Sequence, residues 1–176
     1  MASKKINFFI IIFLIIFFFI ILLNALKKEN VYVPKISILQ EIPNFNVKIF
    51  ETNEKYEFTE ILSNKGHTIV NIWSSWCLPC RDEHKYLIML SKLQSVQIIG
   101  INYKDKINNA KKFIREYQNP YDVILSDDEG LNSIQLGAYG VPETFIIKNS
   151  DRKIVKKYIG PINEKFFKEI NTIIKK

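Results

Sequence analysis

The two cysteines of this chain constrain its fold more than any other feature, because they stand where a predicted strand meets a predicted helix. Residues 67–74 (HTIVNIWS) are β-branched and mostly apolar, which predicts a strand buried on both faces. Residues 78–93 carry apolar side chains at helical spacing, and Pro79 is acceptable in a first helical turn. The stretch WSSWCLPC, residues 73–80, is therefore predicted to be a strand-to-helix junction.

The spacing of Cys77 and Cys80 favours redox chemistry over a structural role. A C-x-x-C loop is too short to remove much entropy from the unfolded chain, so a disulfide there adds little stability. Structural zinc needs four protein ligands, and only His67 and His84 could supplement the pair, so no metal is expected. A thiolate is favoured at a helix N-terminus. Cys77 is therefore the expected nucleophile, and Cys80, one turn inside the helix, is expected to resolve the mixed disulfide.

The residues beside the cysteines are expected to divide between core and surface. Trp73 is predicted to lie in the core, as aromatic residues near a sheet end commonly do. Trp76 lies past the end of the strand and is predicted to form part of the rim that a partner contacts. His84 is expected on the surface or against a neighbouring helix. The dipeptide Leu78-Pro79 is expected to influence the redox potential of the couple.

An uncharged segment of 21 residues lies near the N-terminus, at residues 6–26. At about 1.5 Å per residue it is long enough to span a hydrocarbon core of roughly 30 Å, and it has no polar face. A cleaved signal peptide is the alternative, since Lys4 and Lys5 form a short basic leader. Residues 24–27 (NALK) do not supply a convincing cleavage site, however. The segment is therefore interpreted as an uncleaved transmembrane anchor.

This interpretation assigns the residues on either side of the anchor. Residues 1–5 are expected to form a cytoplasmic tail, residues 27–42 a tether, and residues 43–176 a single domain outside the cytoplasm. The formal net charge of +7 falls to +4 beyond residue 29, and the basic residues of the domain are scattered. Such scattering is typical of a solvated surface, so the sequence predicts no nucleic-acid partner.

The remaining pattern predicts a central mixed sheet flanked by helices. The order of elements places parallel strands early in the sheet and an antiparallel hairpin near its end, with a further hairpin before the first buried strand. The predicted strands are residues 45–50, 56–58, 67–74, 96–103, 123–125, 144–148 and 153–158, and the predicted helices are residues 59–62, 78–93, 108–117, 131–136 and 163–174.

Two glycines and a proline cluster just ahead of a predicted strand, in GAYGVPE at residues 137–143. Such a cluster indicates a tightly specified loop. Most X-Pro bonds are trans and a proline before a strand is usually a turn device, so the residues alone leave the isomer of the Val141-Pro142 bond open. If the loop lies beside Cys77, its free backbone groups can bind an extended substrate segment by strand addition. Tyr139, Val141 and Pro142 are the expected substrate-binding residues.

Three motifs in this order and at this spacing carry a resemblance that a C-x-x-C pair alone would not. They are WSSWCLPCRDEH at residues 73–84, GINYKD at residues 100–105 and GAYGVPETF at residues 137–145. Together they resemble thioredoxin-like proteins and, within them, the periplasmic thiol–disulfide interchange proteins of cytochrome c maturation, the DsbE/CcmG family. The resemblance covers roughly residues 40 to 175, and the N-terminal anchor is similar as well.

The resemblance implies an α/β, thioredoxin-like fold with an N-terminal hairpin extension and an insertion in the middle. It implies that Cys77 and Cys80 are the redox couple and that Pro142 is the cis-proline of the fold. Glu83 and Glu143 match acidic residues characteristic of this family. A carboxylate near a dithiol disfavours the thiolate and can accept or donate a proton, so these residues are expected to tune the couple. The alternative for both is an ordinary surface carboxylate.

Tyr103 and Asp105 of the second motif are expected at the carboxyl end of a strand, where α/β folds place functional groups. The implied function is reduction of the haem-binding C-x-x-C-H segment of apocytochrome c, directly or through a maturation partner. Electrons would come from a transmembrane disulfide reductase of the DsbD/CcdA kind, at the bacterial inner membrane with the domain in the periplasm. No bound cofactor is needed, because the electrons travel as thiols. The alternatives are a reductase for other exported proteins and a non-catalytic chaperone of apocytochrome or haem.

Overall fold

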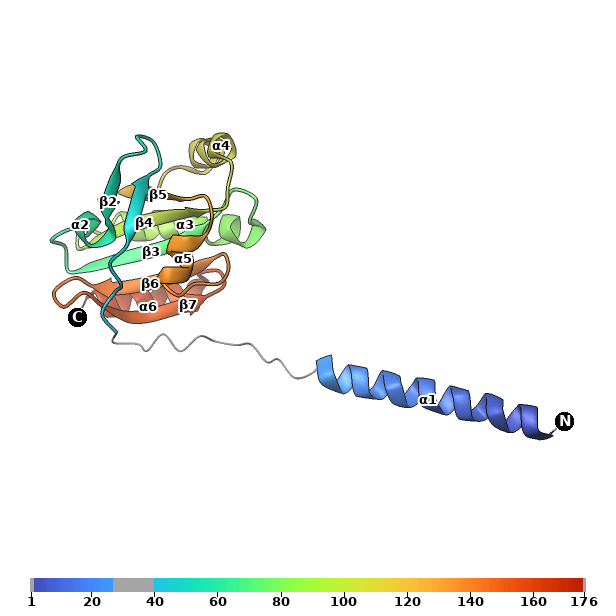
Figure 1. Ribbon diagram of the computed structural model, residues 1–176. Coiled ribbons are helices and arrows are strands. Elements are labelled where there is room, and N and C mark those ends of the chain that lie inside the picture. Colours follow the sequence, from blue (N-terminus) through green and yellow to red (C-terminus); the bar gives the residue numbers. More distant parts are fainter. Residues whose placement is uncertain (1, 27–39, 176) are drawn as a thin grey trace. The chain divides into compact units, whose positions relative to one another are not determined.

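The computed structural model describes residues 2–26 and 40–175 (Figure 1). The chain divides into two compact units, residues 1–35 and 36–176, and each is described by itself. The first unit contains α1 (Ala2–Leu26). The window Asn7–Asn24 has a mean hydropathy of 2.9, so α1 is long and apolar enough to cross a membrane, although a signal sequence has the same properties.

The second unit is built on a mixed sheet of seven strands. Its strands are β1 (Asn46–Ile49), β2 (Lys55–Glu57), β3 (His67–Trp73), β4 (Val96–Tyr103), β5 (Val123–Asp127), β6 (Glu143–Lys148) and β7 (Lys153–Ile159). Its helices are α2 (Phe58–Ile61), α3 (Leu78–Ser91), α4 (Ile107–Tyr117), α5 (Leu131–Gln135) and α6 (Glu164–Ile174). The predicted order of strands and helices is confirmed.

The strand order across the sheet is β2-β1-β5-β4-β3-β6-β7. The central pairs β3 with β4 and β4 with β5 are parallel. The outer pairs are antiparallel, including the N-terminal hairpin of β1 with β2 and the later hairpin of β6 with β7. The predicted mixed sheet with parallel strands at its centre is therefore confirmed.

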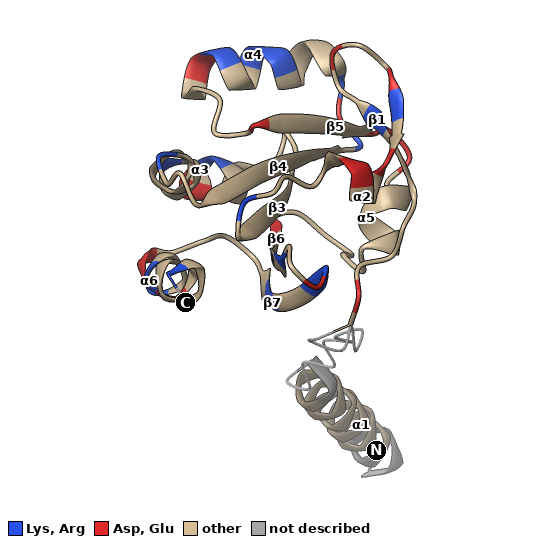
Figure 2. Cartoon of the chain, turned by 90° about the vertical axis from the view of Figure 1, so that its left-hand side faces the viewer, with Lys and Arg blue, Asp and Glu red and all other residues tan. Residues whose placement is uncertain are grey.

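Helices cover both faces of this sheet (Figure 2): α3 and α6 lie on one side, and α2 and α5 lie on the other. Neighbouring side chains of a strand point to opposite faces, and β3 shows this alternation. Its Ile69 belongs to the hydrophobic cluster that also contains Leu87 of α3, whereas Val70 belongs to the cluster that contains Phe58 of α2. The core therefore lies in two layers, with β3 buried between them.

The start of the domain lies earlier than the sequence predicts. Residues 27–42 were expected to form a tether, but Glu41 forms a β-bridge with Lys153, and the Ile42 N–H donates a hydrogen bond to the Arg152 carbonyl at 2.8 Å. The exposed edge of β7 offers unpaired backbone groups that the incoming chain can satisfy. The tether prediction is wrong at this end, and its residues 27–39 lie outside the described part of the chain.

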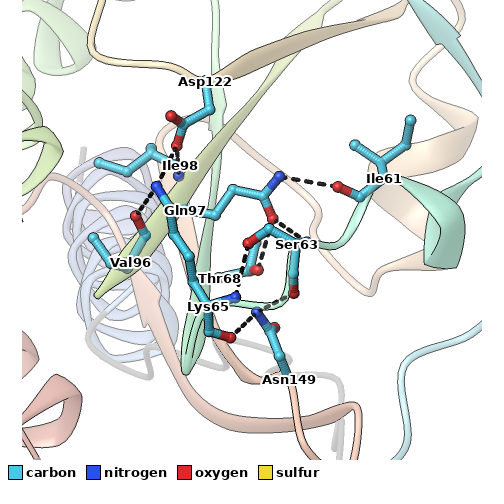
Figure 3. Close-up of polar contacts among 9 residues, drawn as sticks. All are labelled: Ile61, Ser63, Lys65, Thr68, Val96, Gln97, Ile98, Asp122 and Asn149. Carbon is cyan, nitrogen blue, oxygen red and sulfur yellow. Dashed lines mark hydrogen bonds and ion pairs between the residues drawn. The ribbon is translucent and has the colours of Figure 1, made fainter. Parts of the chain in front are cut away.

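Polar side chains connect the amino-terminal ends of β3 and β4 to the loop before them (Figure 3). The Gln97 amide oxygen accepts hydrogen bonds from the Ser63 N–H at 2.9 Å and the Thr68 hydroxyl at 3.0 Å, and its amide nitrogen donates to the Ile61 carbonyl at 2.9 Å. The Asn149 amide donates to the Ser63 carbonyl at 3.2 Å. These side chains, together with two neighbours, form the Gln97 cluster: Ser63, Lys65, Thr68, Gln97, Asp122 and Asn149.

Candidate active site

The cysteines lie between the end of β3 and the start of α3, as predicted. Cys77 is the N-cap residue of α3, and its sulfur accepts a hydrogen bond from the Cys80 N–H at 3.2 Å. Pro79 lies in the first helical turn, where a backbone N–H has no carbonyl partner within the helix, so the missing donor costs nothing. The local sequence therefore sets the sulfur of Cys77 at the positive end of the helix dipole.

Cys77 and Cys80 form a disulfide, with their Cα atoms 5.3 Å apart. Cys77 is 3% exposed and Cys80 is 2% exposed. In the oxidised protein both sulfurs are therefore covered to the same extent. The large side chains before and after Cys77, Trp76 and Leu78, are in contrast 57% and 66% exposed.

The two tryptophans of this junction have different surroundings. Trp73 is 1% exposed, and its ring packs against Phe113 at 5.2 Å and Tyr121 at 5.5 Å between centroids. Its predicted core position is confirmed. The exposed Trp76 is held at the surface by its indole N–H, which donates to the Lys104 carbonyl at 3.0 Å. Its proposed contact with a partner stays a prediction.

The second sequence motif supports the turn before Cys77. The Asp105 carboxylate accepts hydrogen bonds from the Ser75 N–H and, at 2.8 Å, from the Ser75 hydroxyl, while the Asn102 amide donates to it at 3.1 Å. The Ser74 hydroxyl donates to the Tyr103 carbonyl. Asp105 therefore lies beside the cysteine junction, as its place at the end of a strand predicted, and Tyr103 contributes its backbone.

Glu83 lies inside the protein. Its two carboxylate oxygens accept hydrogen bonds from the Asn71 amide and the Ile162 N–H, each at 2.8 Å. Burial raises its pKa from 4.5 to about 7, and these two hydrogen bonds limit the rise. In the described part of the chain no cation forms an ion pair with it. The alternative of a surface carboxylate is therefore wrong, because α3 turns Glu83 toward the core.

Glu143 is also buried, on the strand next to β3. One carboxylate oxygen accepts hydrogen bonds from the Tyr139 and Gly140 N–H groups, both at 3.0 Å. The other oxygen forms an ion pair with the Lys157 ammonium at 2.8 Å, although the two groups are not aligned as a hydrogen bond. A surface position is wrong for this residue too. Unlike Glu83, Glu143 is paired with a cation.

The loop before β6 enters the sheet at the end of β3 that leads to the cysteines, because Glu143 lies opposite Ile72 in the register of β6 and β3. The Val141-Pro142 bond is cis, as the family resemblance implied. Val141 packs against the hydrophobic cluster that contains both cysteines, and Pro142 is buried. Tyr139 is exposed on this loop. The loop therefore lies beside the cysteine junction.

Residues 39–174 match the Redoxin family. A thiol:disulfide interchange protein DsbE of Escherichia coli is 33% identical over 128 residues, which cover 73% of this chain and 68% of that one. The chain belongs to the redoxin family, as a thioredoxin-like protein of the DsbE/CcmG type. The DsbE protein of Pasteurella multocida is 40% identical over 116 residues, 66% of this chain and 63% of that one. The match therefore spans just under two thirds of the Pasteurella protein.

Solved structures show the same fold as this redoxin. StoA of Bacillus subtilis superposes with a TM-score of 0.57 at 24% identity, covering 73% of this chain and 96% of that chain. A thioredoxin-like protein of Aeropyrum pernix gives a TM-score of 0.62 at 17% identity, covering 75% and 88%. At these identities the likeness establishes the fold alone.

One residue of the redoxin site was missed from the sequence. Asn71 lies within β3, where its side-chain nitrogen donates to Glu83 and to the Thr144 hydroxyl at 3.1 Å, and its side-chain oxygen accepts from the Tyr121 hydroxyl at 2.9 Å. Its signal was a single polar residue within a buried apolar strand, since such a group must find partners inside the core. Asn71 thus connects Glu83 to Thr144 of β6 and to Tyr121 in the loop before β5.

The histidines of the redoxin lie apart from the disulfide chemistry. His84 packs its ring against Phe113 at 5.1 Å and contacts the Gln118 carbonyl at 2.9 Å, so the predicted packing against a helix is confirmed. Burial lowers its pKa. His67 begins β3, at the end of the strand opposite the cysteines. Within residues 2–26 and 40–175 no three His, Cys, Asp or Glu side chains are grouped to hold a metal ion.

Proposed function

We propose that the protein is a thiol–disulfide oxidoreductase and that Cys77 and Cys80 are its redox couple. The observation that carries this proposal is a C-x-x-C disulfide at the N-cap of α3, beside the loop that contains Val141 and Pro142. The relatives from Pasteurella multocida and Escherichia coli are named as thiol:disulfide interchange proteins, which agrees with it.

In the reducing direction the thiolate of Cys77 attacks a sulfur of the partner's disulfide. This forms a mixed disulfide and releases one partner thiolate, which takes up a proton. The Cys80 thiol then loses its proton and attacks the Cys77 sulfur, which releases the second partner thiolate and leaves the Cys77–Cys80 disulfide. Two electrons pass to the partner. The Cys80 N–H and the dipole of α3 stabilise the attacking thiolate.

Glu83 is the proposed proton acceptor for the Cys80 thiol. It follows Cys80 by three residues on α3, a spacing that places two side chains on the same helix face. A pKa of about 7 allows this carboxylate to gain or lose a proton near neutral pH, which suits a general acid and base. Asn71 and the Ile162 N–H orient the group within the core.

The proposed cellular role is that of a reductant in cytochrome c maturation. The likeness to the DsbE proteins and the apolar helix α1 support a membrane-anchored domain on the periplasmic side of the inner membrane. The proposed client is the C-x-x-C-H segment of apocytochrome c, or a maturation partner that carries its disulfide. A transmembrane disulfide reductase of the DsbD/CcdA kind is the proposed electron donor.

Trapping of covalent intermediates tests this proposal. In cells with the full chain, Cys80→Ala is expected to accumulate mixed disulfides through Cys77, whereas Cys77→Ala is not. Recovery of a c-type apocytochrome or a maturation factor supports the proposed client, and recovery of other exported proteins alone contradicts it. The reduction potential is expected closer to about −270 mV, the value of thioredoxin, than to about −120 mV, the value of the oxidant DsbA. A non-catalytic chaperone would form no mixed disulfides.

A further inference from the structure

We infer that Lys157 is a positioning residue for the substrate-binding loop, residues 137–142, and that its partner Glu143 shapes this loop instead of exchanging protons with the dithiol. The inference rests on the proposed function, because it concerns how a protein disulfide is presented to Cys77. It gives the two buried carboxylates near the cysteines, Glu83 and Glu143, different roles.

Glu143 holds the loop from its carboxyl end. It is the first residue of β6, and its side chain turns back so that one oxygen accepts the N–H groups of Tyr139 and Gly140. Both donors are partly buried, and this carboxylate supplies the acceptor that a strand ladder would otherwise provide. The backbone of Tyr139, whose side chain is exposed, is thereby bound to the first residue of β6.

Lys157 reaches the same loop from the neighbouring strand, where it lies opposite Phe145 in the register of β6 and β7. Its ammonium lies 2.8 Å from the free oxygen of Glu143, donates a hydrogen bond to the Gly137 carbonyl at 3.0 Å, and lies 4.5 Å from the centre of the Tyr139 ring. One cation therefore contacts the first residue of the loop, its exposed aromatic residue and the carboxylate that closes it.

The burial of this ion pair makes each partner dependent on the other. The side chain of Lys157 is 10% exposed and that of Glu143 is 1% exposed. Removing one member of a buried pair leaves an uncompensated charge, which is strongly destabilising for its surroundings. Both oxygens of Glu143 are engaged with the loop and with Lys157. Glu83, by contrast, forms no ion pair within the described residues.

The geometry of the loop matters only for large substrates. A partner segment bound along residues 139–142 must present its sulfur in line with Cys77, and misplacement by about 1 Å can lower a rate by about 100-fold. A small aromatic disulfide approaches Cys77 without using the loop. A change at Lys157 is therefore expected to separate the two kinds of substrate.

The test compares Lys157→Met with Lys156→Met in the full chain, purified in detergent. Lys156 precedes it on β7 and forms an ion pair with Glu169 of α6 at 2.6 Å, so the second variant removes a neighbouring pair away from the loop. The substrates are a peptide with a disulfide-bonded C-x-x-C-H segment and dithiobis(nitrobenzoate). Each protein is reduced beforehand and freed of reductant, so that its Cys77/Cys80 dithiol supplies the two electrons in a single turnover. For Lys157→Met we expect the second-order rate constant for the peptide to fall at least tenfold, with that for the small disulfide within about twofold of wild type.

Two further measurements exclude a merely structural effect. The thiol pKa of Cys77 and the reduction potential are expected to be unchanged in Lys157→Met, and Lys156→Met is expected to match wild type on both substrates. If Lys157→Met does not fold, Glu143→Gln tests the same contact, because it keeps an oxygen for the two N–H groups and removes the charge. The variant with both Lys157→Met and Glu143→Gln is expected to lose no more of the rate on the peptide than the worse of the two single variants.

The possible results of this test distinguish a failure of the inference from a failure of the proposed function. Equal losses on both substrates, or a shifted Cys77 pKa, would mean that Glu143 acts on the dithiol itself and would overturn the inference. Unchanged kinetics on the peptide would remove any positioning role of Lys157. If wild-type protein reduces neither substrate, the proposed function fails, whereas normal wild-type rates with normal Lys157→Met rates leave that function intact and reject only this inference.

Discussion

The two ends of the parallel strands β3 and β4 both bury polar side chains, but they bury different kinds. At the amino-terminal end the central group is the neutral amide of Gln97, which satisfies the Ser63 N–H and the Ile61 carbonyl (Figure 3). At the carboxyl end the central group is the carboxyl of Glu83, next to the cysteines. A buried amide has one protonation state at every physiological pH, whereas a buried carboxyl near its pKa has two. One end of the sheet is therefore suited to rigidity and the other to proton transfer.

The largest effect is expected at the carboxyl end of these strands, where one substitution should remove activity and change stability little. Cys77→Ser is expected to abolish disulfide exchange, since a hydroxyl cannot form the mixed disulfide. The free energy of unfolding is expected to change by less than about 3 kcal/mol, because the loop closed by the disulfide is so short. Turnover assays and urea titrations measure the two quantities. Residual turnover above the uncatalysed rate would contradict the assignment of Cys77 as the nucleophile.

Gln97→Leu, at the amino-terminal end, is expected to lower stability without lowering activity. It leaves the Ser63 N–H, the Ile61 carbonyl and the Thr68 hydroxyl without their partner, which is expected to cost about 2–4 kcal/mol of unfolding free energy. The specific activity of the folded protein is expected to stay at the wild-type value in the same assay. A loss of activity without a loss of stability would break the comparison.

Glu83 is expected to make stability depend on pH. Its pKa is about 7 in the folded protein and near 4.5 in the unfolded chain. Between pH 4.5 and pH 7 the folded state therefore binds a proton that the unfolded state does not. The contribution to stability is complete below pH 4.5 and is lost as the pH rises through 7, by about 3 kcal/mol at most. Urea titrations at pH 5 and pH 8 are expected to show this difference in wild type and not in Glu83→Gln. An equal difference in both proteins would place the titration elsewhere.

Tyr121→Phe is the smallest change proposed. It removes the hydroxyl that donates to Asn71 and is expected to lower the unfolding free energy by about 1–2 kcal/mol. Because the Asn71 amide still donates to Glu83, the pH dependence of stability is expected to persist. Its disappearance in urea titrations would show that Tyr121 sets the protonation of Glu83, and not only the position of Asn71.

The sequence allowed the fold and the disulfide to be predicted, because both depend on local patterns. The apolar runs and helical spacing around residues 67–93 identify a strand, a junction and a helix without any distant contact. The environment of Glu83 could not be predicted in this way. Its partner Ile162 lies 79 positions away in the chain, and only the packed fold brings them together. The pairing of Glu143 with Lys157 has the same cause, since their strands meet only through the later hairpin.

The contrast between Trp73 and Trp76 gives the protein two built-in optical probes, which are its only tryptophans. Trp76 is open to a dissolved quencher such as iodide, whereas Trp73 is enclosed between aromatic rings. With Trp73 replaced by Phe, the remaining emission is expected to report whatever covers the surface beside Cys77. With Trp76 replaced by Phe, it is expected to report the integrity of the core. Arrival of a partner and loss of the fold can thus be observed separately, in one molecule and without an added dye.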